Sequence, residues 1–142
     1  QWEKNEREVY TGQWMLCELN REFPTWLTIW PRERMDKLFG SKTIRTGNET
    51  FDKRFNVSSD DEAAALHILT PDCAEKILAL ANSSFGKLAI NLNSDGRLYL
   101  AVHSGHGFFD LGKGREDPAQ LRRRFTRELT WFTNMIDVFR GA

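Results

Sequence analysis

The segment from Phe51 to Leu80 constrains the fold most, because it joins one extended run to two helical runs with almost no loop between them. In an extended chain, successive side chains point to opposite faces. Phe51, Phe55 and Val57 would then share one face. The pattern predicts a half-buried strand over residues 51–57, and such a strand needs a second layer to cover its apolar side.

A short helix is predicted directly after this strand, over residues 63–69. Ser59 and Glu62 have the spacing of a capping box, in which a side chain before the helix accepts a backbone N–H bond from its first turn. Asp60 and Asp61 lie between them and can accept such bonds as well. We therefore expect Ser59, Asp60 and Asp61 to have structural roles at the start of this helix.

Two more helix starts follow the same chemistry. Thr70 stands before Pro71, and proline is disfavoured inside a helix but favoured at its first position, so Thr70 is predicted to cap a helix over residues 71–83. Asp117 stands before Pro118 in the same way and is predicted to cap the last helix. That helix has an apolar stripe made of Leu121, Phe125, Leu129, Phe132, Ile136 and Phe139.

The segment around Phe51 resembles the signature of an uncharacterised bacterial family catalogued as domain of unknown function 3137. The positions that carry the resemblance are Phe51, Phe55, Val57, Asp60, Asp61, Ala65, Ile68, Leu69, Thr70 and Pro71. It extends from about Tyr10 to Val138. The other similar positions are Tyr10, Gly12, the strand-like run 98–102 and Phe109.

The resemblance implies a location and a fold-level identity, but no catalytic residues, because the family has no established activity. In many members the domain follows a membrane-anchoring segment and faces the cytoplasm. We therefore expect this chain to be cytoplasmic and tethered to the inner membrane by a segment upstream of Gln1. One departure is Ala64, which stands where members often carry a glutamate.

Length and charge indicate one domain, spanning residues 1–142, with residues 1–8 as the end of a linker in a longer chain. A chain of 142 residues can bury enough surface for one core. Lys plus Arg equals Asp plus Glu, at 20 each, so no overall charge attracts nucleic acid. No apolar run is long enough to insert into a membrane. Cys17 and Cys73 are predicted to be buried free thiols.

Strand patterns complete the predicted fold. Residues 87–93 and 97–103 alternate cleanly around Gly96 and predict a hairpin. Residues 26–30 predict another strand. Residues 9–19 are apolar on both faces, which is typical of a central strand covered on both sides. The predicted fold class is α+β: an antiparallel sheet with a central hairpin, two or three shorter helices, and a long C-terminal amphipathic helix packed on it.

Candidate chemistry is sparse. His103 and His106 are a close pair, and with Asp60 or Asp61 they could bind a metal ion or act as acid and base. Zinc needs three or four ligands, so exposed loop histidines are favoured over a metal site. Residues 107–113 match only part of a phosphate-binding loop, because glycine follows where serine or threonine is required. We expect no metal, no cofactor and no catalytic residues.

The arginines at the start of the last helix are the one basic cluster. Arg123 and Arg127 are four residues apart and can share a helix face, which makes them candidate contacts for an anionic partner. A solvated helix flank is the simpler interpretation.

Two functional hypotheses remain open. The first is a non-catalytic interaction domain of a membrane-anchored protein, which binds another protein or a segment of its own chain. The alternative is a small hydrolase or metal-binding protein that uses His103, His106 and Asp60 or Asp61.

Overall fold

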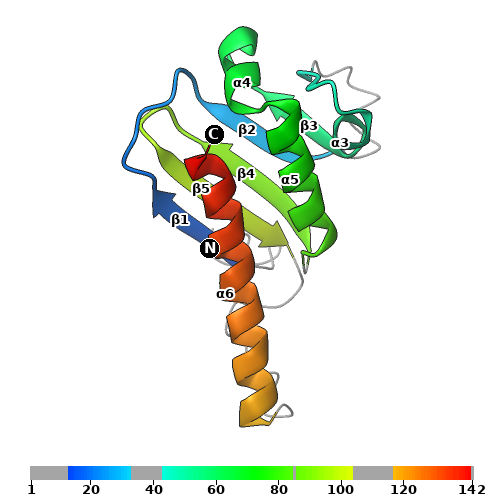
Figure 1. Cartoon of the computed structure of the whole chain (residues 1–142), viewed down its shortest axis with the longest axis vertical. Coiled ribbons are helices and arrows are strands. Elements are labelled where there is room, and N and C mark those ends of the chain that lie inside the picture. Colours follow the sequence, from blue (N-terminus) through cyan, green and yellow to red (C-terminus); the bar gives the residue numbers. More distant parts are fainter. Residues whose placement is uncertain (1–12, 33–42, 85, 104–116, 142) are drawn as a thin grey trace, which may run out of the picture.

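The computed structural model describes residues 13–32, 43–84, 86–103 and 117–141. Within these residues, five strands form one antiparallel sheet in the order β1-β5-β4-β2-β3 (Figure 1). The strands are β1 (Gln13–Glu18), β2 (Leu27–Pro31), β3 (Phe55–Ser58), β4 (Lys87–Leu92) and β5 (Arg97–His103). The helices in the described residues are α3 (Glu49–Arg54), α4 (Glu62–Ile68), α5 (Pro71–Asn82) and α6 (Pro118–Arg140). The predicted α+β class, with a long closing helix, is confirmed.

The β4–β5 hairpin is confirmed and lies in the middle of the sheet. Leu88 pairs with Val102 and Leu92 with Leu98, and all four side chains are buried on the same face. Gly96 has a φ of 92°, the left-handed region in which glycine is favoured. It also lies against the backbone of Arg21, where a Cβ would overlap the carbonyl oxygen. The turn therefore requires glycine for two independent reasons.

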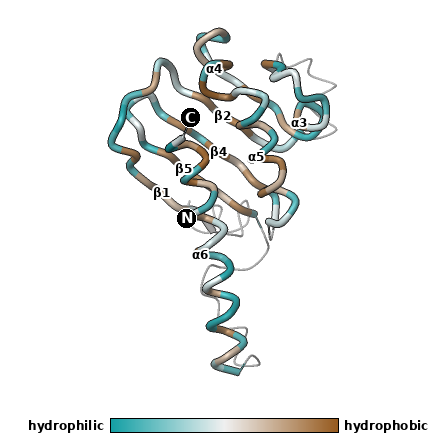
Figure 2. Tube along the Cα trace, in the orientation of Figure 1, coloured by the Kyte–Doolittle hydropathy of each residue, from teal (hydrophilic) through white to brown (hydrophobic). Residues whose placement is uncertain are grey.

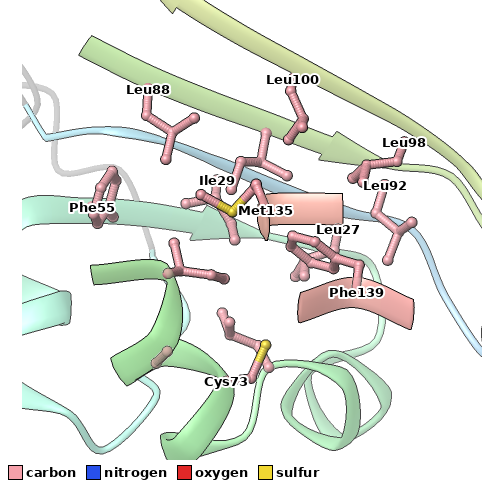
Figure 3. Close-up of a cluster of buried hydrophobic side chains, with 14 of the residues drawn as sticks. Leu27, Ile29, Phe55, Cys73, Leu88, Leu92, Leu98, Leu100, Met135 and Phe139 are labelled. Carbon is pink, nitrogen blue, oxygen red and sulfur yellow. The ribbon is translucent and has the colours of Figure 1, made fainter. Parts of the chain in front are cut away.

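Helices α5 and α6 cover one face of the sheet, and the core lies between them and the strands (Figure 1). Figure 3 shows Met135 and Phe139 of α6 beside the leucines that rise from the strands. Both are fully buried, as are Ile77 of α5 and Ile29 of β2. Each side chain of this kind stabilises the fold by about 1.5–3 kcal/mol through removal of apolar surface from water. This layer fixes where α6 lies.

The predicted strand over residues 51–57 is wrong in its first half. Glu49–Arg54 form α3, and the strand begins at Phe55. Asn48 caps the helix by accepting a hydrogen bond from the N–H of Phe51 at 3.1 Å. Phe51 and Phe55 are four residues apart, a spacing that puts side chains on one side of both a strand and a helix. Their rings lie 5.0 Å apart between centroids and both are buried.

The prediction of a central first strand is also wrong. β1 is an edge strand that pairs with β5 alone among the described strands. Met15 and Cys17 pack against the core, whereas Trp14 and Leu16 on the other face are 66% and 47% exposed. Cys17 is therefore half-buried rather than buried, while Cys73 is buried as predicted, and both thiols are free. Although β1 has apolar residues on both faces, only the face of Met15 and Cys17 is packed against the core.

Candidate functional site

The acidic residues before α4 belong to a polar cluster that joins this helix to the start of β2. Asp61 is the N-cap, and its carboxylate accepts a hydrogen bond from the N–H of Ala64 at 3.1 Å. Asp60 instead accepts a bond from the hydroxyl of Thr25 at 2.8 Å, and Ser59 donates to the carbonyl of Trp26 at 2.7 Å. Asp61 is a cap as predicted, but Ser59 and Asp60 tie α4 to the start of β2.

The two further predicted caps are present. Thr70 accepts a hydrogen bond from the N–H of Cys73 at 3.1 Å and begins α5. Asp117 accepts one from the N–H of Gln120 at 2.9 Å and begins α6. Each bond satisfies a backbone donor that has no partner inside the helix. These side chains determine where α5 and α6 begin.

Asp60 and His103, two members of the alternative site, are not brought together. His103 ends β5 and pairs with Lys87 at one end of the β4–β5 hairpin. Asp60 follows β3 and bonds Thr25, beyond the opposite end of the sheet. The length of β5 separates the two ends, roughly 20 Å at ~3.3 Å per residue. His106 lies outside the described residues. Among the residues that the structure describes, no group of three His, Cys, Asp or Glu side chains could hold a metal ion.

The arginine cluster occupies the N-terminal half of α6. Figure 1 shows that α6 runs well past the sheet, and Figure 2 shows that the projecting half is largely hydrophilic. Residues 118–127 hold four arginines and no acidic residue. Arg122, Arg123 and Arg127 are exposed, whereas Arg124 is half-buried with its guanidinium 5.3 Å from the centre of the Phe125 ring. We refer to Arg122, Arg123 and Arg127 as the arginine face.

Two hollows adjoin the arginine face. The first, of about 540 Å³, has as its described lining the arginine face with Gln120 and Thr126. The second, of about 590 Å³, lies between the end of α5 and the middle of α6. Its described lining includes Leu80 and Trp131, together with Ser83, Ser84, Arg124, Thr126, Arg127, Glu128, Thr130 and Asn134. Arg127 borders both hollows, so a positive surface and an apolar recess are continuous.

A hydrogen bond between α6 and α5 positions the Trp131 wall of the recess. The indole of Trp131 bonds the carbonyl of Leu80 near the end of α5, where carbonyls have no partner inside the helix. The guanidinium of Arg54 donates a hydrogen bond to the next carbonyl oxygen, that of Ala81, at 3.2 Å. Sequence reasoning missed the recess, because its wall comes from α5 as well as from α6.

A family model described as "Protein of unknown function (DUF3137)" matches residues 8–140. No curated protein and no solved structure matches the chain. Among the described helices, none combines the length and the apolar character needed to cross a bilayer.

Proposed function

The chain belongs to the DUF3137 family, and from that membership together with the surface of α6 we propose that it is a non-catalytic interaction domain that binds an acidic protein segment. The segment belongs to another protein or to another part of the same chain. The observation that carries the proposal is the arginine face beside the recess that Trp131 and Leu80 line. Nucleic acid is not the proposed partner, because the chain as a whole has no net charge.

The chemistry of the surface supports an acidic segment over a simple anion. Guanidinium groups form paired hydrogen bonds with carboxylates, and these bonds are stronger than those between neutral groups. Arg123 and Arg127 lie four residues apart, which suits two carboxylates presented in sequence. The recess beside Arg127 adds apolar wall from Leu80 and Trp131, which suits a hydrophobic side chain between or beside the carboxylates.

The same proposal includes a non-catalytic role and a cytoplasmic location. Asp60 is engaged with Thr25, Asp61 caps α4, and His103 lies at the far end of the sheet, which supports a structural role for the two carboxylates. A broad hydrolase assay of the purified protein checks the non-catalytic role, and turnover above that of a heat-denatured sample would contradict it. The resemblance to anchored family members supports a cytoplasmic domain tethered to the inner membrane, and fractionation of the tagged natural protein checks it.

The binding proposal is tested with a short fluorescent peptide of glutamates around two leucines, measured by anisotropy. Arg123→Glu with Arg127→Glu is expected to weaken binding about tenfold or more, because two attractions become repulsions. The matched control is Arg45→Glu with Lys76→Glu. It makes the same charge change at two exposed residues, Arg45 before α3 and Lys76 on α5. Equal loss in both variants, or no binding by the wild type at low salt, would contradict the proposal.

A second pair of peptides tests the recess. Replacing the two leucines of the probe by serine is expected to weaken binding severalfold if the apolar recess contributes. If the leucine and serine peptides bind equally, the surface attracts negative charge without selecting a protein segment, and the acidic-segment proposal fails.

A further inference from the structure

A third hollow, of about 530 Å³, lies beside α3, away from the arginine face of α6 (Figure 1). Its described lining comes from the residue after β2, from the segment before α3 and from α3 itself. The residues are Arg32, Arg45, Glu49, Asp52 and Lys53. Three of the five side chains are cationic, and the volume lies in the range of small-molecule sites, roughly 300–1,000 Å³. The lining therefore favours a small ligand with negative charge.

Hydrogen bonds fix the backbone of this lining. The N–H of Arg32 donates to the carbonyl of Arg54, the last residue of α3, at 2.8 Å. Asp52 is buried, and its carboxylate accepts two bonds from Thr46, one from the N–H at 3.0 Å and one from the hydroxyl at 2.9 Å. These bonds hold the end of β2 and the segment that carries Arg45 against α3. The hollow is thus shaped before a ligand binds, which lowers the free-energy cost of binding.

The three cations lack partners among the described residues. The Nε of Arg32 is buried, and no hydrogen-bond acceptor for it is present there. Arg45 and Lys53 are exposed, and neither forms an ion pair with another described residue. Arg54 differs, because its guanidinium bonds Asn82 of α5. A buried donor without an acceptor is unfavourable, and an oxyanion in the hollow would supply the acceptor.

We propose that this hollow binds a small phosphate ester, with the phosphate group among Arg32, Arg45 and Lys53. The phosphate of an ester has three terminal oxygens that accept hydrogen bonds and about 1.5 to 2 negative charges at neutral pH. Arginine pairs with phosphate through two parallel bonds, and lysine adds a point charge. A carboxylate has one charge and two oxygens, which matches three cations from three segments less well.

The carboxylates of the lining narrow the ligand to an ester that also carries hydroxyl groups. Asp52 is engaged by Thr46. Glu49 is exposed and lies one turn before Lys53 on α3, so its oxygens can accept hydrogen bonds from ligand hydroxyls beside the phosphate. Inorganic phosphate places mainly negative charge next to Glu49, whereas a sugar phosphate presents both kinds of group. The ligand class is therefore a phosphate ester of a polyhydroxyl compound.

Isothermal titration calorimetry of the purified chain with glucose 6-phosphate at low salt tests the site. The wild type should bind it, and Arg32→Gln and Arg45→Gln should each weaken binding about tenfold, since each removes hydrogen bonds to a charged group. Arg123→Glu with Arg127→Glu, which tests the arginine face, keeps the hollow intact and should bind like the wild type. The two proposals can therefore fail separately. No binding by the wild type, or equal losses in all three variants, overturns this one.

Urea denaturation in phosphate-free buffer separates binding from structure. Arg32→Gln should leave the midpoint close to that of the wild type, because its Nε has no described acceptor, whereas Arg54→Gln should lower it by removing bonds to α5. Glucose 6-phosphate should raise the midpoint of the wild type and of Arg54→Gln, but not that of Arg32→Gln. A loss of stability without ligand in Arg32→Gln as large as that in Arg54→Gln assigns Arg32 a structural role and overturns the proposal.

Two further probes define the ligand. Inorganic phosphate lacks the sugar hydroxyls and should bind severalfold more weakly than glucose 6-phosphate, and Glu49→Gln should reduce this preference, since a neutral amide is the weaker acceptor. Phosphatidylcholine vesicles that contain phosphatidic acid present the phosphate as a lipid headgroup and should not displace glucose 6-phosphate. Equal binding of the ester and inorganic phosphate, or displacement by the vesicles, overturns the assignment to a free polyhydroxyl phosphate ester.

Discussion

The indole Nε1 of Trp131 donates a hydrogen bond to the backbone carbonyl oxygen of Leu80 at 2.7 Å. The bond joins the middle of α6 to the last turn of α5, and Trp131 itself is 6% exposed. Its position in the wall of the recess makes the shape of the proposed binding surface depend on the docking of the two helices.

Replacing Trp131 by phenylalanine is expected to lower the free energy of unfolding by about 1–2 kcal/mol. Phenylalanine retains most of the apolar area but leaves the Leu80 carbonyl without this donor. Urea denaturation measures the change. Trp14→Phe is the control, because Trp14 is exposed and its replacement should alter stability by less than about 0.5 kcal/mol in dilute protein. Equal effects would mean that the hydrogen bond contributes nothing.

Gly96→Ala is expected to destabilise the protein more than Gly47→Ala. Both glycines have a φ of 92°, so both substitutions incur the cost of a left-handed backbone, about 1–2 kcal/mol. At Gly96 the added Cβ also meets the carbonyl of Arg21, whereas at Gly47 no atom lies within 4 Å. Thermal melts of the two variants separate the clash from the backbone cost. If the two melting temperatures fall equally, the close approach at Gly96 has no energetic effect.

Substitutions of the two adjacent aspartates should differ in their effects. Asp61→Ala removes the N-cap of α4 and is expected to cost about 1 kcal/mol, while Asp61→Asn should cost little because asparagine also caps. Asp60→Asn should cost little as well, since its amide oxygen can still accept from Thr25. Melts with and without divalent cations provide the check. A cation-dependent rise in melting temperature that Asp60→Asn abolishes would assign Asp60 to a metal site.

Ionisation of the Cys73 thiol should lower the stability of the protein at high pH. Burial raises the pKa of this thiol from its ordinary value of 9.0 to about 11; Asp72 adds to the rise and Lys76 opposes it. Between these values the unfolded chain loses the proton that the folded chain retains, so the unfolded state gains stability as pH rises. The contribution is present below pH 9 and is lost by about pH 11. Its full size is roughly 2–3 kcal/mol.

The measurement is the free energy of unfolding between pH 8 and 11, in the wild type and in Cys73→Ala. The variant is expected to be less stable at pH 8 but to lose less stability over this range. Leu129→Ala, which removes no titratable group, is the control and should follow the wild-type slope. Parallel curves for wild type and Cys73→Ala would contradict the assignment.

Phe55→Ala is expected to cost roughly 3–5 kcal/mol, because the ring is 2% exposed within the main core cluster. It begins β3 and also packs beside Phe51 of α3, so the cavity would lie where a helix and a strand meet. Leu129→Ala, at a largely exposed leucine, should change stability by less than about 0.5 kcal/mol. A cost below about 1.5 kcal/mol for Phe55→Ala would mean that the site collapses around the smaller side chain.

The features that sequence predicted well are those whose causes are local. The β4–β5 hairpin follows from strict alternation and one turn glycine, and the starts of α5 and α6 follow from a capping side chain followed by proline. The α+β class follows from these elements together. Phe51 was misassigned because a spacing of four residues fits both a strand and a helix, and the capping role of Asn48 was not recognised.

The features that sequence missed depend on which elements become neighbours. The edge position of β1 depends on its pairing with β5, which no local pattern encodes. Trp14 and Leu16 look like core residues until the sheet order shows that the described helices lie on the other face. The recess beside the arginine face also needs two elements, because Leu80 comes from α5 and Trp131 from α6. Arg123 and Arg127 could be proposed as contacts for an anionic partner from their spacing alone, but the apolar recess beside them could not.

The pairing of β1 with β5 has a consequence for the order of folding. Gln13 lies opposite Val102, so most of the chain separates the two partners, whereas β4 and β5 are joined by a tight turn. Hairpins close in microseconds, but contacts between distant residues must first overcome the entropy of closing a long loop. We therefore expect β1 to dock last, onto a hairpin that has already formed. During that interval the edge of β5 is uncovered, and the folding chain is most exposed to pairing with strands of neighbouring chains.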